Sequence, residues 1–189
     1  MKYALGVLGV IIVAVLAILL ITRKPGEPQT PVNAPRKVDL TQENTDGTSL
    51  VYTTYGTLVG QDQRRGIRIT VSQDERRIEM LTGYESTVST SQIFENTPIA
   101  YQNFLSAIKR AGFIKSQKTP IIDELGVCPL GQRYSYDFKD YGEEITHLWS
   151  TSCAAGQGSF AGSPTLVRTL FQKQIPDYSK VVSGINLAP

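Results

Sequence analysis

The feature that most constrains this chain is an unbroken apolar run close to its N-terminus. From Ala4 to Ile21, eighteen residues carry no charged or strongly polar side chain, and Tyr3 and Thr22 extend the run to twenty. A helix of that length rises about 1.5 Å per residue and covers roughly 30 Å, the hydrocarbon thickness of a bilayer. In lipid the segment must satisfy its own backbone polar groups, so a helix is expected. We therefore predict a transmembrane signal anchor at residues 1–24.

A cleaved secretory signal is the alternative interpretation of this run. Such signals have an apolar core of about 7 to 15 residues, followed by small residues at the cleavage site. The run here is longer, and Leu19–Lys24 offers no such site. The flanking charges nearly balance, with Lys2 on one side and Arg23 and Lys24 on the other. Because the run opens so near the N-terminus, we expect a single-pass protein of the cell membrane with its C-terminal domain outside the cytoplasm.

Residues 25–49 change composition to Pro, Thr, Gln, Asn and Asp. Their prolines recur every three or four residues at Pro25, Pro28, Pro31 and Pro35. Such a stretch buries too little apolar surface to offset the ordering of its backbone, and its prolines hold it extended. We expect an extended linker, followed by one extracytoplasmic domain at residues 50–189.

Alternating apolar and polar residues predict the strands of this domain. They fall at Leu50–Val59, Gly66–Val71 and Arg76–Leu81, with a further extended stretch at Tyr84–Phe94. A turn at Gln73 and Asp74 would place Ile69 opposite Ile78, Ile67 opposite Met80 and Arg68 opposite Glu79. One face of this hairpin is then apolar and the other is paired by charge, as in an antiparallel sheet with one wet side.

Two segments carry the signals of amphipathic helices. Thr97 and Pro98 form an N-cap and first helical residue, followed by an apolar stripe that ends before Gly112. Ser163 and Pro164 repeat the pattern. The resulting order β-β-β-α-β-β-α predicts an α+β fold, with both helices packed on one face of a mainly antiparallel sheet.

The chain has two cysteines, which bracket a predicted hairpin with its turn near Lys139–Gly142. If the turn is centred between Asp140 and Tyr141, Tyr134 faces His147 and Gln132 faces Trp149, on a mostly apolar face that also carries Cys128 and Cys153. Outside the cytoplasm two thiols within reach tend to oxidise, so we predict a disulfide. Closing such a loop should add about 3 to 4 kcal/mol of stability. A free or catalytic thiol and a metal ligand remain alternatives.

Candidate ligand-binding residues form two groups. Five arginines lie on or beside the first hairpin: Arg64, Arg65, Arg68, Arg76 and Arg77. They would suit an anionic envelope polymer, a phospholipid headgroup or nucleic acid. The acidic residues interleaved with these arginines favour instead a surface whose opposite charges pair with one another. On the second hairpin, Tyr134, His147 and Trp149 could form a stacking platform, and an apolar face under a helix is the alternative.

No pattern of catalytic residues stands out. His147 is the only histidine, so any Ser-His-Asp mechanism would have to use it, and Glu143 and Glu144 should point to opposite faces of a strand. The glycine-rich segment 154–162 lacks the Lys of a phosphate-binding loop, and we interpret it as a connection. Two Cys and one His are too few for a structural zinc site. We predict no cofactor and no metal.

Two families resemble the chain in part. Ser150-Thr151-Ser152-Cys153, together with the N-terminal run, faintly resembles the sortases, which are membrane-anchored thiol transpeptidases. His147 lies too close to Cys153 in sequence for that mechanism. Pilins also combine an N-terminal apolar helix, an antiparallel sheet and a late disulfide, but Pro25 interrupts the helix, and the leader-peptidase glycine before Phe, with an acidic fifth residue, is missing.

The favoured hypothesis is a non-enzymatic domain, tethered to the membrane, that binds or organises an envelope polymer or a partner protein. An envelope hydrolase or transpeptidase and a pilin-like subunit are the alternatives. The whole chain has 19 basic and 17 acidic residues, and three of the basic ones flank the anchor. The domain itself is therefore close to neutral, and we predict no specific nucleic acid partner. The oligomeric state stays open.

Overall fold

The computed structural model describes residues 39–40, 45–121, 123–153 and 157–187. The predicted anchor at residues 1–24 and most of the predicted linker lie outside the described residues. In the described part of the chain, no helix has the length and apolar character needed to cross a membrane. The folded part begins before residue 50, because Leu40 is buried in the core and Asp39 forms an ion pair with Lys109.

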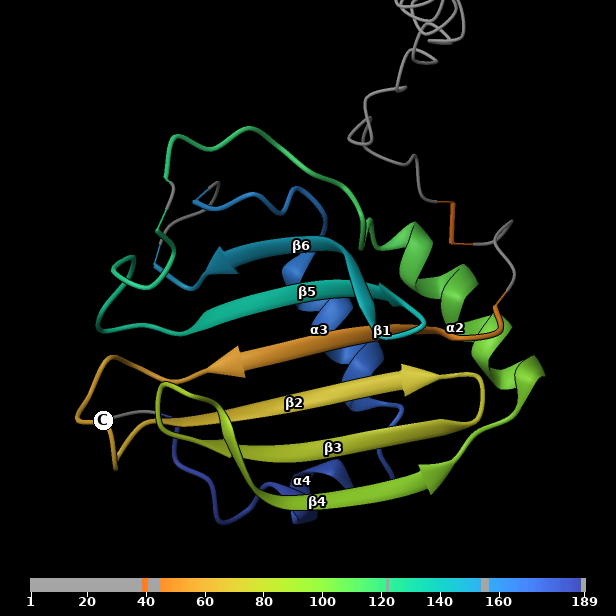
Figure 1. The fold of residues 1–189 in the computed structure, drawn as a ribbon, viewed down its shortest axis with the longest axis horizontal. Coiled ribbons are helices and arrows are strands. Elements are labelled where there is room, and N and C mark those ends of the chain that lie inside the picture. Colours follow the sequence, from red (N-terminus) through yellow and green to blue (C-terminus); the bar gives the residue numbers. More distant parts are fainter. Residues whose placement is uncertain (1–38, 41–44, 122, 154–156, 188–189) are drawn as a thin grey trace, which may run out of the picture. The chain divides into compact units, whose positions relative to one another are not determined.

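The fold is α+β, and its centre is a six-stranded sheet in the order β4-β3-β2-β1-β5-β6. All neighbouring strands are antiparallel. Figure 1 shows β1 in the middle of the sheet, between β2 and β5. The strands span Thr48–Tyr55 (β1), Arg65–Ser72 (β2), Glu75–Thr82 (β3), Thr87–Glu95 (β4), Arg133–Asp140 (β5) and Glu143–Thr151 (β6). The expected order of elements thus gains a fourth strand, β4, in the stretch predicted to be extended.

In the part of the chain that the structure describes, three helices lie on one face of the sheet, behind it in the view of Figure 1: α2 (Pro98–Arg110), α3 (Pro164–Gln172) and the short α4 (Tyr178–Val181). The predicted caps of the two longer helices are confirmed. The side chain of Thr97 accepts a hydrogen bond from the Ala100 N–H, and Ser163 accepts one from the Leu166 N–H. These contacts satisfy backbone donors that a helix leaves unpaired at its start.

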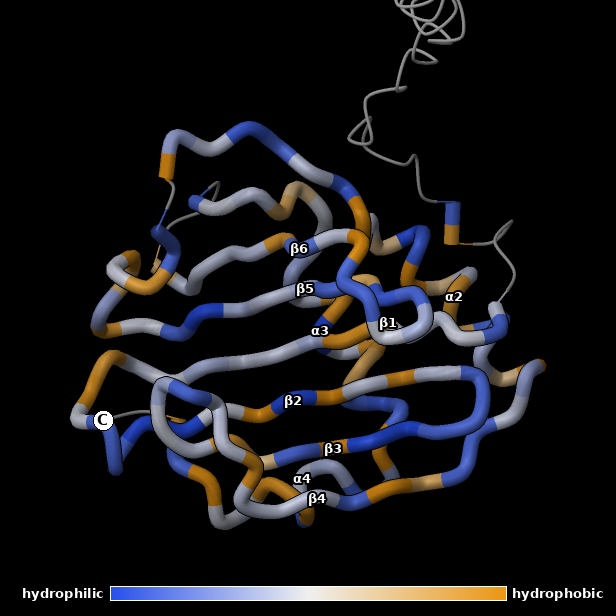
Figure 2. Tube along the Cα trace, viewed as in Figure 1, coloured by the Kyte–Doolittle hydropathy of each residue, from blue (hydrophilic) through white to orange (hydrophobic). Residues whose placement is uncertain are grey.

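The core lies between the sheet and these helices. Figure 2 shows apolar and polar residues alternating along β2 and β3, so that each strand turns its apolar side chains to the helices. Phe171 of α3 is fully buried and contacts the rings of Tyr52, Phe104 and Phe113. This aromatic cluster joins β1 to both longer helices and fixes which face of the sheet is covered.

The predicted register of the first hairpin is confirmed. Ile69 lies opposite Ile78, and Arg68 lies opposite Glu79. The turn residues and the alternation of apolar and polar residues predict the same pairing here, so the sequence is sufficient to predict the register of this hairpin.

The predicted register of the second hairpin is wrong. Tyr134 lies opposite Ser150, and His147 lies opposite Asp137. The turn is the residue pair Tyr141 and Gly142, both with positive φ, as a two-residue type I′ hairpin loop requires. A bulge in the β5–β6 ladder then shifts the strand pairing by one further residue. The observed pairing therefore differs from the predicted pairing by an odd number of residues. For this reason His147 and Trp149 lie on the face of the sheet opposite Tyr134.

Candidate functional site

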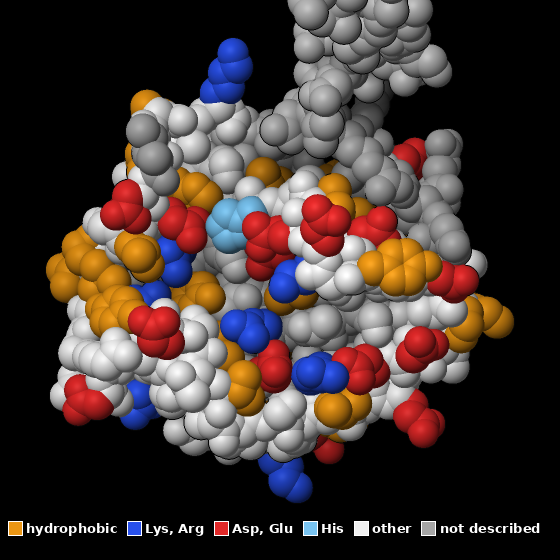
Figure 3. Space-filling model, viewed as in Figure 1, with side chains coloured by type: hydrophobic (Ala, Val, Ile, Leu, Met, Phe, Trp, Pro, Cys, Tyr) orange, Lys and Arg blue, Asp and Glu red, His pale blue; other side chains and the backbone are white. Residues whose placement is uncertain are grey.

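One face of the sheet carries no helix of the described residues, and it holds a shallow cavity of about 260 Å³. Its floor is made of the small side chains of Val51, Thr53 and Ser135 in β1 and β5. Longer side chains form its walls: Tyr55, Arg68, Glu124, Asp137, Lys139, Glu144 and His147. Figure 3 shows this face, where acidic and basic side chains gather around the histidine. Small residues at the centre and long ones around them therefore hollow out a charged depression, which we call the open-face cavity.

His147 is held between two carboxylates at the wall of this cavity. Its Nδ1 lies 2.5 Å from Oδ1 of Asp137, and its Nε2 lies 3.3 Å from Oε2 of Glu124. These hydrogen bonds, first the one to Asp137 and then the one to Glu124, raise the pKa of His147 to about 10 against the opposing effect of burial. The imidazole is therefore a cation at neutral pH, with a carboxylate at each nitrogen.

Glu124 reaches this site from the long loop between α2 and β5. Besides His147 it binds Arg133, with 3.0 Å between Oε1 and Nη1. Burial alone would raise the pKa of Glu124, but the hydrogen bond from His147 and the charge of Arg133 lower it overall. Glu124 was not among the predicted site residues, because a carboxylate in a loop, far along the chain from its partners, carries no local signal.

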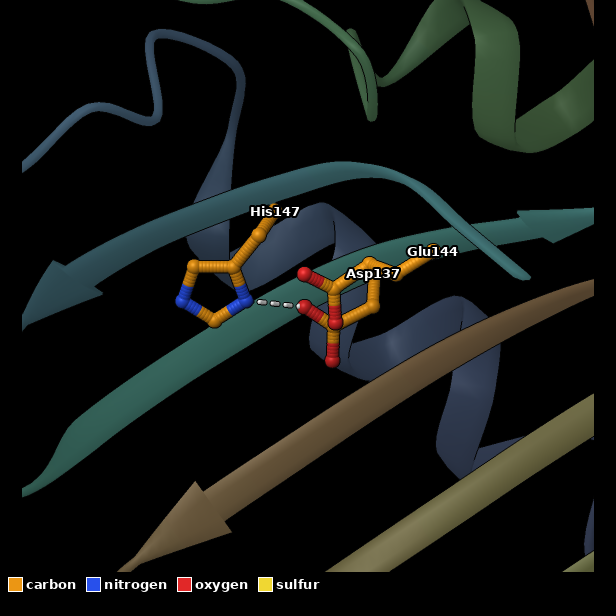
Figure 4. A group of neighbouring side chains, drawn as sticks. All are labelled: Asp137, Glu144 and His147. Carbon is orange, nitrogen blue, oxygen red and sulfur yellow. Dashed lines mark hydrogen bonds and ion pairs between the residues drawn. The ribbon is translucent and has the colours of Figure 1, made fainter. Parts of the chain in front are cut away.

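A bulge adds a third carboxylate beside His147. Phe138 pairs with Thr146 and Lys139 pairs with Glu144, so Ile145 is the extra residue of β6. The bulge turns Glu144 to the same face as His147, as bulges often do near functional sites. Figure 4 shows Asp137, Glu144 and His147 side by side, and one ligand atom of each lies within 4.8 Å of the others.

These three side chains could ligate a divalent cation through one nitrogen and two oxygens. The metal would need the lone pair of an imidazole nitrogen, and both nitrogens of His147 are engaged with carboxylates. It would therefore have to displace a proton that Asp137 and Glu124 hold strongly, in a cavity that Lys139 also lines.

The five predicted arginines do not form one patch. Arg68 faces the open-face cavity and forms an ion pair with Glu79 at 3.4 Å. Arg77 binds Glu75 at 2.6 Å. Arg76 bonds to backbone carbonyls of Glu95 and Gln174, and Arg65 bonds to those of Asp62 and Arg64. The hairpin distributes these side chains over both faces and pairs most of them locally.

Arg64 is the exception, because it is buried. Only 2% of it is exposed, and its guanidinium lies 4.3 Å from the ring centre of Tyr84 and 5.2 Å from that of Tyr55. Among the described residues no hydrogen-bond partner reaches its Nε or Nη1. Arg133 also lies over Tyr55, 4.7 Å from the ring centre. Cation–π contacts thus link Arg64, through Tyr55, to the Arg133–Glu124–His147 chain of ion pairs.

The predicted aromatic residues are separated by the sheet. Tyr134 lies on the helix side, where its ring stacks on Tyr52. Trp149 pairs with Ser135 on the opposite face and is 5% exposed. The structure therefore brings His147 and Trp149 to one face, and it does not bring Tyr134 to them.

The predicted disulfide between Cys128 and Cys153 is confirmed. It joins the loop that precedes β5 to the residues that follow β6, so it ties the base of the second hairpin. The wrong register did not affect this prediction, because both cysteines lie beyond the ends of the paired strands. The bond uses both thiols of the chain.

Comparison with known proteins adds no family to this description. No protein-family model matches the chain. No curated protein matches it significantly.

Proposed function

We propose that the chain is a non-enzymatic binding domain, tethered to a membrane and placed outside the cytoplasm, whose open-face cavity binds a charged ligand. The observation that carries the proposal is a sheet whose described helices all lie on one face, with a charged-walled cavity on the other face. The tether and the location rest on the apolar run Ala4–Ile21 and on the disulfide.

The state of His147 supports binding over catalysis. A general base needs a free lone pair and a pKa near the working pH. Both imidazole nitrogens are engaged with carboxylates, and the pKa is raised to about 10. The disulfide likewise withholds both sulfurs from a thiol mechanism of the sortase kind. These contacts make His147 part of the cavity wall and favour the non-enzymatic hypothesis.

The charges that line the cavity indicate the chemical class of the ligand. Asp137 and Glu124 are paired with His147. Lys139 and Glu144 lie opposite each other on β5 and β6 and also line the cavity. Among the described residues neither of these two has an ion-pair partner. A cavity with one cation and one anion left to pair suits a ligand that carries both signs, such as the peptide part of an envelope polymer or a segment of a partner protein.

Photo-crosslinking in intact cells tests this proposal. A photoreactive residue at Thr70, on the open face of β2, should capture the ligand, whereas one at exposed Gln102 of α2, on the other side, should not. The double change Lys139→Ala/Glu144→Ala should remove the Thr70 product. Equal capture from both positions, or capture that survives the double change, would contradict binding in the cavity. Protease accessibility in the same cells tests the location.

A further inference from the structure

Among the described residues, the chain covers one end of the β6 edge of the sheet and leaves the β4 edge uncovered. Along β6, Trp149 donates its N–H to the Ser159 side chain and accepts a hydrogen bond from the Phe160 N–H. Gly158 also forms a bridge with Ser150. Among the described residues, β4 pairs only with β3, and every residue of β4 except Phe94 is exposed. One edge of hydrogen-bonding groups is therefore available.

The composition of β4 is unusual for an exposed edge. Edge strands are commonly protected by charged residues or proline. From Thr87 to Phe94 the strand contains neither. It also exposes two apolar side chains, Val88 at 44% and Ile93 at 58%. Apart from its bulge at Ser89, which is itself a common protection of edge strands, β4 has the side chains of a strand that is paired.

A bulge sets the side to which each residue of β4 points. Met80 pairs with Thr90 and Leu81 pairs with Val88, so Ser89 is the extra residue. Because of this shift, Val88 lies on the same face as Ser91 and Ile93, the face without helices. Thr90 and Gln92 lie on the helix side, opposite Met80 and Ile78.

We propose that β4 is a dimerisation strand, which pairs antiparallel with β4 of a second copy of this chain about a two-fold axis at Ser91. In this register Ser91 lies opposite itself, and Thr90 of each copy lies opposite Gln92 of the other. The bulge at Ser89 then brings Val88 of each copy opposite Ile93 of the other on the open face. Every facing pair is uncharged, so the strand meets its own copy without repulsion, and the two exposed apolar residues cover each other.

The strand that pairs with β4 belongs to a second copy of this chain, because the free edges of two copies match. Among the described residues of each copy, β4 has no second partner strand, whereas residues 158–160 cover β6 at Trp149 and Ser150. Two copies joined through β4 use both β4 edges, and residues 158–160 obstruct further strand addition at one end of each β6 edge. This is the isologous contact of a closed two-fold dimer. The inference rests on β4 alone and does not depend on the ligand of the open-face cavity.

Cysteine crosslinking of the full chain in intact cells tests the register. Facing residues of an antiparallel pair lie about 4.5 to 5.5 Å apart at Cα, within the range that a disulfide spans. Ser91→Cys should therefore give a disulfide-linked dimer on a non-reducing gel. Thr87→Cys, on the same strand, is the matched control, because two such residues would lie roughly 25 Å apart in this register. A monomer with Ser91→Cys, equal dimer from both variants, or a link to a different protein would overturn the proposal.

A pair of charge variants tests the facing residues directly. In the Ser91→Cys background, Thr90→Lys with Gln92→Lys places like charges opposite each other twice and should lower the dimer yield about fivefold or more. Thr90→Lys with Gln92→Glu places opposite charges there and should retain the dimer. Both positions are exposed, so neither variant disturbs the core. Equal yields from the two variants would overturn the proposed register.

Discussion

His147 and Asp137 lie directly opposite each other on β6 and β5, with 2.5 Å between Nδ1 and Oδ1. Glu124 holds the other nitrogen of the same ring. The only histidine of the chain is thus a structural cation that orders the wall of the open-face cavity and joins a distant loop to the sheet.

The contribution of His147 to stability should depend on pH. Its pKa is 6.5 when unperturbed and about 10 in the fold, so the ion pairs stabilise fully below about pH 6.5 and their effect is lost as pH rises to about 10. The difference in unfolding free energy between the natural chain and His147→Gln should shrink steadily from pH 6 to pH 9.5 in urea denaturation. Because the side chain is 38% exposed, screening keeps this difference modest. A difference that grows with pH would contradict the assignment.

Removal of the disulfide should destabilise the domain. The bond closes a loop with a sequence separation of 25 residues, which corresponds to about 3 to 4 kcal/mol in the chain-entropy picture. Cys128→Ser/Cys153→Ser should lower the unfolding free energy by about 3 kcal/mol, measured by urea denaturation. Reduction of the natural chain is the control and should give a similar loss. An unchanged midpoint on reduction would argue against a stabilising bond.

Phe171 should be among the most sensitive positions of the core. It is fully buried and contacts three other rings, so Phe171→Ala should cost about 3 to 5 kcal/mol of unfolding free energy. Leu166→Ala on the same helix is the control, since Leu166 is 46% exposed, and its effect should stay within about 0.5 kcal/mol. Similar losses for both variants in thermal denaturation would contradict the packing described.

Gly158 should be required to cover the β6 edge at Trp149 and Ser150. Its φ is +108°, and a Cβ at this position would overlap the carbonyl of Trp149. Gly158→Ala should therefore displace residues 158–160 and speed hydrogen exchange at the Phe160 amide, which bonds to Trp149. Gly184→Ala is the control, because a Cβ there meets no atom within 4 Å. Unchanged exchange at Phe160 would show that the edge does not need this glycine.

The sequence predicted the parts of the fold that depend on local signals. The register of β2 and β3 follows from alternation and one turn, and the starts of α2 and α3 follow from Thr97 and Ser163. The β5–β6 register depended on features without such signals, a tyrosine with positive φ at Tyr141 and a bulge at Ile145. That bulge sets the distance between Glu144 and His147, so an error in register became an error in the site.

The rest of the candidate site depends on contacts between distant parts of the chain. Glu124 meets His147 across 23 residues, and Arg64 meets Tyr55 and Tyr84 only once three segments have folded. Among the arginines predicted as ligand-binding residues, only Arg68 lines the open-face cavity. Composition and spacing identify such residues as charged, and the fold decides which of them meet.

Titration of His147 by NMR tests the central claim most directly, because the chain has one histidine and its Hε1 proton gives one resonance. The account predicts that this resonance does not move between pH 5.5 and pH 8.5, since the imidazole stays protonated through that range. A titration midpoint near 6.5 would contradict it, because the ring would then be free of its carboxylates and available as a base.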